Sequence, residues 1–293
     1  MKLLHSNVKS IFQADIVVIG VPDESRSHAK RRGASKGPDS LRVASNSFEF
    51  FEREGKIIPI CPMKGTLENK KIFDFGNITR EDLYRLVFDI VSAKKLPKTI
   101  GGDHSITMLI LQAIHDALGE DKISLLYFDA HPDFVSSTRN YYGSVITDSS
   151  DYINFAKSIL IGTRAAELEE LQNASKHGLE IITPLDITEF GINATAKKII
   201  SKCGSSKVYL SLDLDCMDPG VAPGVSVPAP GGLFPLDLIY MIKKISENLQ
   251  ILGMDIVELS PDYDLNQNTA NHASRILMEM ISSLNVQFDK NTD

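Results

Sequence analysis

Residues 125–133 read Leu-Leu-Tyr-Phe-Asp-Ala-His-Pro-Asp, an apolar, strand-forming run that passes directly into three metal-capable side chains. These are Asp129, His131 and Asp133, spaced two residues apart. If the strand continues through them, all three point to one face of the sheet. An unpaired buried charge is very costly, so two carboxylates and an imidazole at the end of a buried strand require a cation. We therefore predict a metal site at this position.

Two further stretches repeat this arrangement. Residues 208–218 contain Asp213 and Asp215 after an apolar run, and residues 101–105 read Gly-Gly-Asp-His-Ser, which supplies His104. A single Asp or His at a strand end is usually only a hydrogen-bonding loop residue, but three clusters are hard to explain as accidents. The carboxyl ends of parallel strands meet at the edge where ligands bind. Two bridged ions suit the combined set better than one. The set is His104, Asp129, His131, Asp133, Asp213 and Asp215.

The rest of the chain alternates strand-like and helix-like segments. We expect strands near residues 15–20, 57–60, 72–75, 98–100, 123–129, 158–161, 180–182, 207–213 and 251–256. We expect helices near residues 38–51, 79–91, 105–118, 167–177, 193–201 and 268–284, and another after residue 235. This alternation predicts βαβ units in a three-layer α/β/α fold with a mostly parallel sheet of about eight strands. No shift in composition marks a boundary, so we expect residues 1–293 to form a single domain.

Composition excludes several classes of function. The chain has 293 residues, of which 43% are hydrophobic and 24% are charged, as in ordinary soluble globular proteins. A net charge of -7 argues against nucleic acid as a partner. There is no apolar stretch long enough for a membrane span or a signal peptide, so we expect a cytoplasmic protein. Cys61, Cys203 and Cys216 lack metal or redox spacing and are expected to be reduced thiols.

As a set, the three metal-capable motifs resemble the metal signatures of the ureohydrolases, the arginase and agmatinase family. They are residues 101–105, residues 129–133 (Asp-Ala-His-Pro-Asp) and residues 211–219 (Ser-Leu-Asp-Leu-Asp-Cys-Met-Asp-Pro). Residues 32–38 resemble the family's N-terminal loop, and residues 255–258 (Asp-Ile-Val-Glu) resemble its last strand. The resemblance therefore covers nearly the whole chain and implies an arginase-like fold.

The resemblance also implies a distribution of the ligands over two ions. His104 and Asp133 would belong to one ion and His131 and Asp215 to the other, with Asp129 and Asp213 bridging them. Carboxylate-rich ligation with two imidazoles favours Mn²⁺ over Zn²⁺, while ligand type does not distinguish Mn²⁺ from Co, Ni or Fe ions. Family members associate as trimers or hexamers, which implies a homo-oligomer.

The chemistry implied by the family is hydrolysis of a guanidinium group to urea and an amine. Glu258 matches the family's Val-Glu position and would hold the guanidinium through a paired hydrogen bond. Asp133 would hydrogen-bond the nucleophile and pass its proton to the leaving nitrogen. We expect agmatine, which would give putrescine and urea, as the substrate.

The substrate loop departs from the family pattern. Family arginases and agmatinases carry His-Gly where this chain has Tyr142-Gly143, and a tyrosine with a pKa near 10 is a poor proton shuttle. Residues 134–142 also lack the Asn, Thr and Ser pattern by which arginases hold arginine. Arg139 could bind the carboxylate of guanidinobutyrate or formiminoglutamate, or it could be solvated. A metal-binding, non-catalytic subunit is a further alternative.

Overall fold

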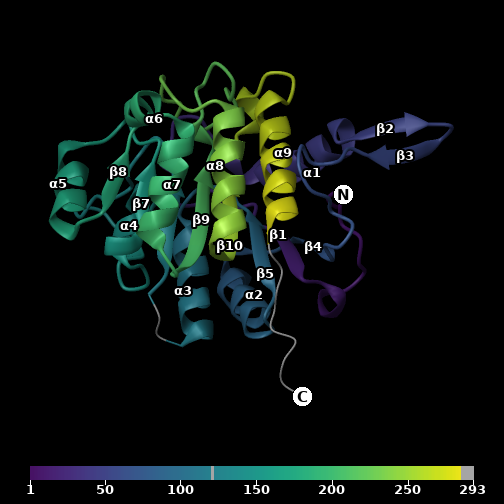
Figure 1. Ribbon diagram of the computed structural model, residues 1–293, viewed down its shortest axis with the longest axis horizontal. Helices are drawn as coiled ribbons and strands as arrows, with labels where there is room; N and C mark the ends of the chain where they lie inside the picture. Colours follow the sequence, from purple (N-terminus) through teal and green to yellow (C-terminus); the bar gives the residue numbers. More distant parts are fainter. Residues whose placement is uncertain (120–121, 285–293) are drawn as a thin grey trace.

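The computed structural model describes residues 1–119 and 122–284, and within them its centre is an eight-stranded parallel sheet (Figure 1). The strand order is β4-β1-β5-β10-β9-β6-β7-β8. The strands are β1 (Ile16–Gly20), β4 (Ile72–Asn77), β5 (Leu96–Ile100), β6 (Ser124–Phe128), β7 (Ile159–Ile161), β8 (Glu180–Ile182), β9 (Lys207–Asp213) and β10 (Gln250–Val257). Every neighbouring pair in this sheet runs parallel.

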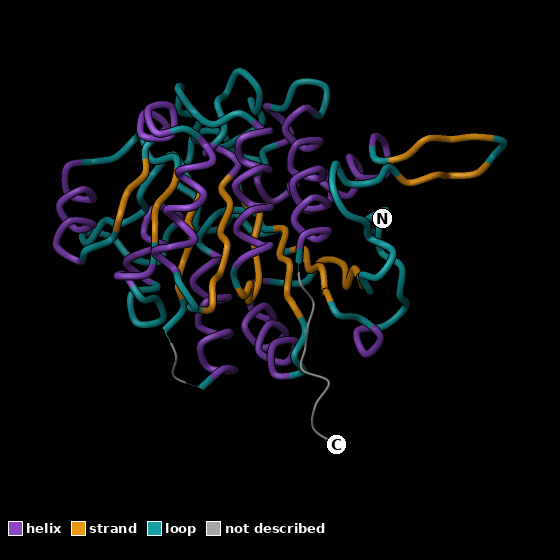
Figure 2. The backbone as a smooth tube through the Cα atoms, viewed as in Figure 1, coloured by secondary structure: helices purple, strands orange, loops and turns teal. Residues whose placement is uncertain are grey.

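Helices cover both faces of the sheet (Figure 2). One core contains residues of α1 (Gly37–Phe48), α6 (Pro184–Phe190), α7 (Ile192–Cys203), α8 (Pro235–Asn248) and α9 (Asn268–Ser283). The other contains residues of α2 (Arg80–Ser92), α3 (Ile106–Leu118), α4 (Val145–Asp148) and α5 (Leu168–His177). Successive strand residues alternate between the two cores, as Val18 and Val17 do, because side chains alternate across a strand. The predicted three-layer α/β/α fold is confirmed.

A hairpin replaces the end of the first predicted helix. We expected residues 38–51 to be helical, but α1 ends at Phe48, and β2 (Phe50–Arg53) pairs antiparallel with β3 (Lys56–Pro59). Glu54 and Gly55 between them both have positive φ, which is the conformation of a two-residue hairpin turn. The segment predicted as a strand at residues 57–60 therefore forms a strand outside the central sheet. Figure 1 shows the hairpin extending away from the body of the molecule.

The short helix α6 was also not predicted from the sequence. α6 begins after Thr183, whose hydroxyl accepts a hydrogen bond from the Asp186 amide while Pro184 occupies the first turn. Thr-Pro-x-Asp is a helix-start signal that the sequence contains. The remaining short 3₁₀ turns are Ile11–Gln13, Ala34–Lys36, Tyr142–Ser144, Phe155–Lys157, Leu214–Cys216 and Pro261–Tyr263. No helix in the described part of the chain is long and apolar enough to cross a membrane.

Candidate metal centre

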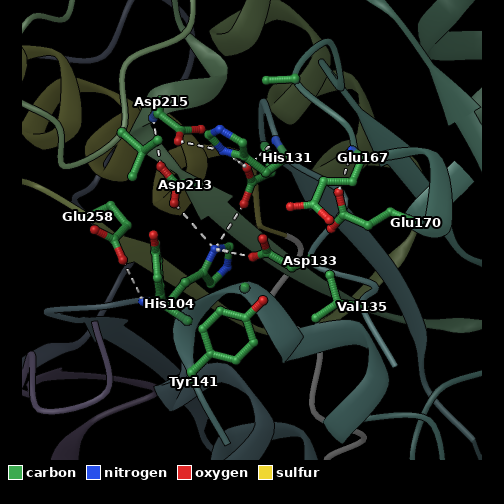
Figure 3. A pocket seen from close by; sticks show the side chains of 15 residues that line it. His104, His131, Asp133, Val135, Tyr141, Glu167, Glu170, Asp213, Asp215 and Glu258 are labelled. Atoms are coloured by element: carbon green, nitrogen blue, oxygen red, sulfur yellow. Dashed lines mark hydrogen bonds and ion pairs between the residues drawn. The ribbon is translucent and has the colours of Figure 1, made fainter. Parts of the chain in front are cut away.

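Three strands deliver the six predicted ligands to one edge of the sheet, and a fourth delivers Glu258. β5, β10, β9 and β6 lie side by side in that order, and polar residues follow the carboxyl end of each. His104 lies between β5 and α3, residues 129–133 follow β6, Asp213 ends β9, and Glu258 follows β10. Because parallel strands bring their carboxyl ends to the same edge, residues 154 positions apart become neighbours (Figure 3).

The ligand clusters are turns rather than strand faces, which corrects the expectation that the strands continue through them. β6 ends at Phe128, before the first ligand. Asp129 Oδ1 accepts a hydrogen bond from the His131 amide at 2.6 Å, and Asp213 Oδ1 accepts one from the Asp215 amide at 2.7 Å. An aspartate that bonds the amide two residues ahead closes a turn and reverses the chain. The residues converge for this reason, not because of strand alternation.

Nitrogen and oxygen atoms form two adjoining groups. Around His104 Nδ1 lie Asp129 Oδ2 at 3.0 Å, Asp213 Oδ2 at 3.3 Å and Asp133 Oδ2 at 3.7 Å. Around His131 Nδ1 lie Asp215 Oδ2 at 3.0 Å and Asp129 Oδ1 at 3.4 Å. Asp129 belongs to both groups through different oxygens. The ligand atoms of His104, Asp129 and Asp213 lie within 4.8 Å of one another, as do those of Asp129, His131 and Asp215. The structure thus offers two neighbouring cation positions that share one carboxylate.

Burial and mutual repulsion make this cluster electrostatically costly without cations. Burial and the charge of Asp129 raise the pKa of Asp133 well above its usual value, and burial with neighbouring carboxylates also raises the pKa of Asp213 and of Asp215. Burial opposes ionisation of Asp129, but hydrogen bonds from His104 and His131 outweigh it and lower its pKa. Four buried carboxylates and two imidazoles are therefore a donor set that fits a pair of divalent ions.

A buried polar network fixes the orientation of His104. Its Nε2 lies 2.8 Å from Ser211 Oγ, and Ser211 Oγ donates to Asp255 Oδ1 at 2.7 Å. Since the serine proton points to Asp255, the serine oxygen accepts from Nε2–H, and Nδ1 is the ring nitrogen that faces the carboxylates. Thr107 and Tyr209 also donate to Asp255. The sequence analysis missed this network, although Ser211 and Asp255 both lie in the motifs it quoted.

Glu258 faces the same cavity from the end of β10. Its Oε1 accepts a hydrogen bond from the His104 amide at 2.9 Å, while Oε2 has no hydrogen-bond partner among the described residues. Burial raises the pKa of Glu258 to about 8. A buried carboxylate with one unsatisfied oxygen is suited to a cationic hydrogen-bond donor brought in by a ligand.

The cavity over the centre has a volume of about 140 Å³ and an acidic outer wall. Glu167 and Glu170 at the start of α5 line it across from Glu258 (Figure 3), and the sequence analysis did not single them out. Glu170 is buried and accepts hydrogen bonds from the amides of Phe134 and Glu167. The remaining lining residues are Val135, Tyr141, Tyr142, Gly143, Ala165 and Val227, with the six ligands. The lining therefore combines apolar and acidic side chains without lysine or arginine in the described part of the chain.

The substrate-loop residues take different positions. Tyr142 lines the cavity, and burial raises its pKa, so its hydroxyl keeps its proton at neutral pH. Tyr141 lines it too and stacks on the His28 ring with centroids 5.2 Å apart. Arg139 does not line the cavity: it donates to the Thr147 carbonyl at 3.1 Å and lies 3.7 Å from Asp148. The structure does not place Arg139 where it could hold a substrate carboxylate.

The three cysteines are free, with Cys61 exposed and Cys203 and Cys216 buried. Cys216 lies among apolar residues of the core, and neither group of candidate ligands includes it. Its place directly after the ligand Asp215 does not bring its sulfur into the centre.

Comparison with known proteins gives concordant results. The model of the Arginase family matches residues 14–282. A Neisseria meningitidis serogroup C protein named agmatinase is 31% identical over 283 residues, covering 92% of this chain and 86% of its own. Among solved structures, agmatine ureohydrolase of Thermoplasma volcanium superposes with a TM-score of 0.82 at 28% identity, covering 97% of this chain and 94% of that one. Proclavaminate amidino hydrolase of Streptomyces clavuligerus gives 0.81 at 28% identity, covering 92% and 91%.

Proposed function

The chain belongs to the arginase family of hydrolases, and we propose that it converts agmatine to putrescine and urea at the centre described above. The observation that carries the choice of substrate is the lining of the cavity, which has Glu258 on one side, Glu167 and Glu170 across from it, and also the apolar side chains of Val135, Ala165 and Val227. Agmatine carries a guanidinium at one end, an ammonium at the other and four methylene groups between. A cavity of this charge pattern matches such a dication better than an acidic guanidino compound.

We propose that His104, Asp129, His131, Asp133, Asp213 and Asp215 hold two divalent ions. When bound, such a pair lowers the pKa of water from about 16 toward neutrality and makes hydroxide available as the nucleophile. The carboxylate-rich donor set supports Mn²⁺ as the physiological metal.

Glu258 is the proposed partner of the guanidinium. Its unsatisfied Oε2 lies in the cavity beside the His104 group, and its Oε1 is held by a backbone amide. A carboxylate fixed in this way holds the planar guanidinium beside the nucleophile. Asp133, which lines the same cavity, is the proposed group that accepts the proton of the nucleophile and passes it to the leaving nitrogen.

Glu167 is the proposed partner of the distal ammonium. It is exposed at the mouth of the cavity, on the wall opposite Glu258, and Val135 and Val227 lie along the lining for the methylene chain. Since Arg139 is engaged with Thr147 and Asp148, no described cation in the lining favours a carboxylate-bearing substrate.

Assembly and location are further parts of this proposal. The β2–β3 hairpin exposes large apolar side chains, including Phe51 and Ile57, which are 59% and 60% exposed. Apolar side chains on a projecting hairpin support a homo-oligomer. Three unpaired cysteines support a reducing, cytoplasmic location. We also propose that residues 1–293 form a single domain, of which the family match covers residues 14–282. Residues 120–121 and 285–293 lie outside the described part of the chain.

A substrate panel tests the proposal. Protein incubated with Mn²⁺ is assayed with agmatine, arginine, 4-guanidinobutanoate and formiminoglutamate, and urea or formamide and the amine product are quantified. We expect equimolar urea and putrescine from agmatine, with kcat/KM at least tenfold above that for 4-guanidinobutanoate. Faster turnover of either acidic compound would overturn the assignment of the substrate, and turnover of none would overturn the assignment of the activity.

A further inference from the structure

Tyr127 is a fully buried tyrosine whose hydroxyl group is committed to the metal centre. It lies on β6, two residues before the first ligand, with its ring in the apolar core between the sheet and α3. Its hydroxyl donates to Asp133 Oδ2 and lies 3.0 Å from His104 Nδ1. The tyrosine and imidazole rings are stacked, with centroids 4.6 Å apart and an interplanar angle of 7°. One side chain thus contacts two candidate ligands of the same ion.

The four carboxylate ligands differ in the hydrogen-bond donor that fixes their orientation. Asp129, Asp213 and Asp215 each have Oδ1 fixed by a backbone amide, from His131, Asp215 and Ala130 respectively. Each therefore presents its second oxygen in a fixed direction. Asp133 receives no backbone amide hydrogen bond among the described residues, and the donor to its carboxylate is the Tyr127 hydroxyl.

The backbone conformation of Asp133 makes its carboxylate more dependent on the hydrogen bond from Tyr127. Asp133 has a φ of 49°, a left-handed conformation that is unfavourable for a residue with a Cβ atom. Its loop alone does not hold the carboxylate in one direction, whereas the turns at Asp129 and Asp213 do. A donor from the rigid central strand replaces the missing backbone amide.

We propose that Tyr127 is a positioning residue of the first metal position, where its hydroxyl orients Asp133 and its ring orients His104. The inference rests on the proposed two-ion centre and adds a residue that acts on one ion only. Among the described residues, neither His131 nor Asp215, on which the second position is built, forms a hydrogen bond, ion pair or ring contact with Tyr127. Loss of the hydroxyl should therefore weaken one of two binding steps.

Metal titration of Tyr127→Phe tests the proposal without reference to activity. Equilibrium dialysis against Mn²⁺, followed by metal analysis, gives the number and affinity of bound ions, and electron paramagnetic resonance reports the spin-coupled pair. We expect two ions in the wild type. In Tyr127→Phe, one affinity should fall tenfold to 100-fold while the other changes less than twofold. Tyr127→Leu, which also removes the ring, should lower the same affinity further.

Two controls separate positioning from general destabilisation. Tyr84→Phe removes a tyrosine hydrogen bond to Asp116 that joins α2 and α3 away from the cavity, and it should leave both affinities unchanged. The thermal midpoint of the metal-free protein shows whether Tyr127→Phe is folded. Equal loss of both affinities, or two affinities within twofold of the wild type, would overturn the role of Tyr127. A wild type that binds no ions would instead contradict the proposed metal centre.

Discussion

Asp133 and Glu258 both have left-handed backbone conformations, with φ values of 49° and 64°. Such conformations are uncommon for residues other than glycine and cost free energy, so the surrounding structure must impose them. Both residues directly follow a strand or its ligand turn, and both carry proposed catalytic roles. The sequence motifs located these carboxylates, but a motif does not specify the φ angle that aims each one into the cavity.

Glu258→Gln tests the guanidinium partner. Glutamine keeps an oxygen that can accept from the His104 amide and removes the charge that faces the substrate. We expect kcat/KM for agmatine to fall about 100-fold or more, with bound Mn²⁺ unchanged, because a charge-assisted pair is lost. Steady-state kinetics and metal analysis measure the two quantities, and Glu189→Gln, exposed on α6, is the matched control. Activity within threefold of the wild type would contradict the role.

Glu167→Gln tests the partner of the ammonium tail. Removing this exposed charge should raise KM for agmatine several-fold and leave kcat within twofold, since the tail lies away from the reacting carbon. The ratio of kcat/KM for agmatine to kcat/KM for 4-guanidinobutanoate should also fall. The carboxylate of 4-guanidinobutanoate is no longer repelled by the negative charge of Glu167 in this variant. Glu189→Gln again serves as the control. An unchanged ratio would show that Glu167 does not contribute to specificity.

Lys98 is a residue whose environment the sequence did not reveal. It lies on β5 between β1 and β10, is 1% exposed, and its Nζ has no hydrogen-bond partner among the described residues. Burial lowers the pKa of Lys98 to about 7. The folded state then binds fewer protons than the unfolded state between pH 7 and about 10.5, so stability should increase as the pH rises through that range.

Lys98→Met should therefore stabilise the fold. We expect the free energy of unfolding to rise by about 2–4 kcal/mol at pH 7, because an unpaired buried ammonium is removed. The gain should shrink as the pH rises toward about 10.5, because the lysine becomes neutral in both states only above that value. Urea unfolding at pH 6, 7.5 and 9.5 measures it, with exposed Lys176→Met as the control. A gain that is the same at all three pH values would contradict the account.

At the scale of elements, the sequence predicted the alternation of strands and helices because buried strands and amphipathic helices have distinct patterns. Strand β9 and the start of α9 were placed at the observed residues. The failures have physical reasons. The helix was predicted to extend to Phe51 because this residue continues the apolar spacing of α1. Phe51 instead lies in β2, which the Glu54-Gly55 turn joins to β3 as a hairpin. The ligands were assigned to strand faces, whereas aspartate-to-amide hydrogen bonds fold them into turns.

The packing of α1 on the edge strand β4 depends on one buried ion pair. Arg42 donates from Nε to Asp74 Oδ2 at 2.8 Å and from Nη2 to Asp74 Oδ1 at 2.9 Å. Asp74 also accepts from the Leu3 amide, which ties down the N-terminal segment. Burial opposes ionisation of Asp74, but the Arg42 hydrogen bonds outweigh it and lower its pKa. The stabilisation is present above the unfolded-state pKa near 4 and is lost as the pH falls below it.

Asp74→Asn should destabilise the protein by about 3–5 kcal/mol at pH 7, because it leaves the buried Arg42 charge with only the exposed Asp39 carboxylate, 3.7 Å away, as an ion-pair partner. Asp89→Asn removes the partner of the exposed Arg85 on α2 and should change stability by less than about 0.5 kcal/mol. Urea unfolding of the two variants in parallel measures the difference. Equal effects would show that the buried pair does not anchor α1.

At the scale of the whole molecule, the sheet order determines the site. β5, β10, β9 and β6 are neighbours although they are far apart in the sequence, so their carboxyl ends form one edge. The sequence predicted which residues gather there, since each cluster follows a strand. It could not predict that Glu167 and Glu170 of α5 would form the opposite wall, or that Arg139 would lie outside the cavity. Those positions depend on loop paths that no local pattern specifies.

Urea release from agmatine as a function of bound Mn²⁺ tests whether the two cation positions form the hydrolytic centre. Chelator-stripped protein is titrated with Mn²⁺ while bound metal and urea are measured in the same samples. We expect no urea from the stripped protein, full activity as the second ion is bound and complete reversal by chelator. Equal urea release without metal, or two bound ions with no urea from agmatine, would contradict it.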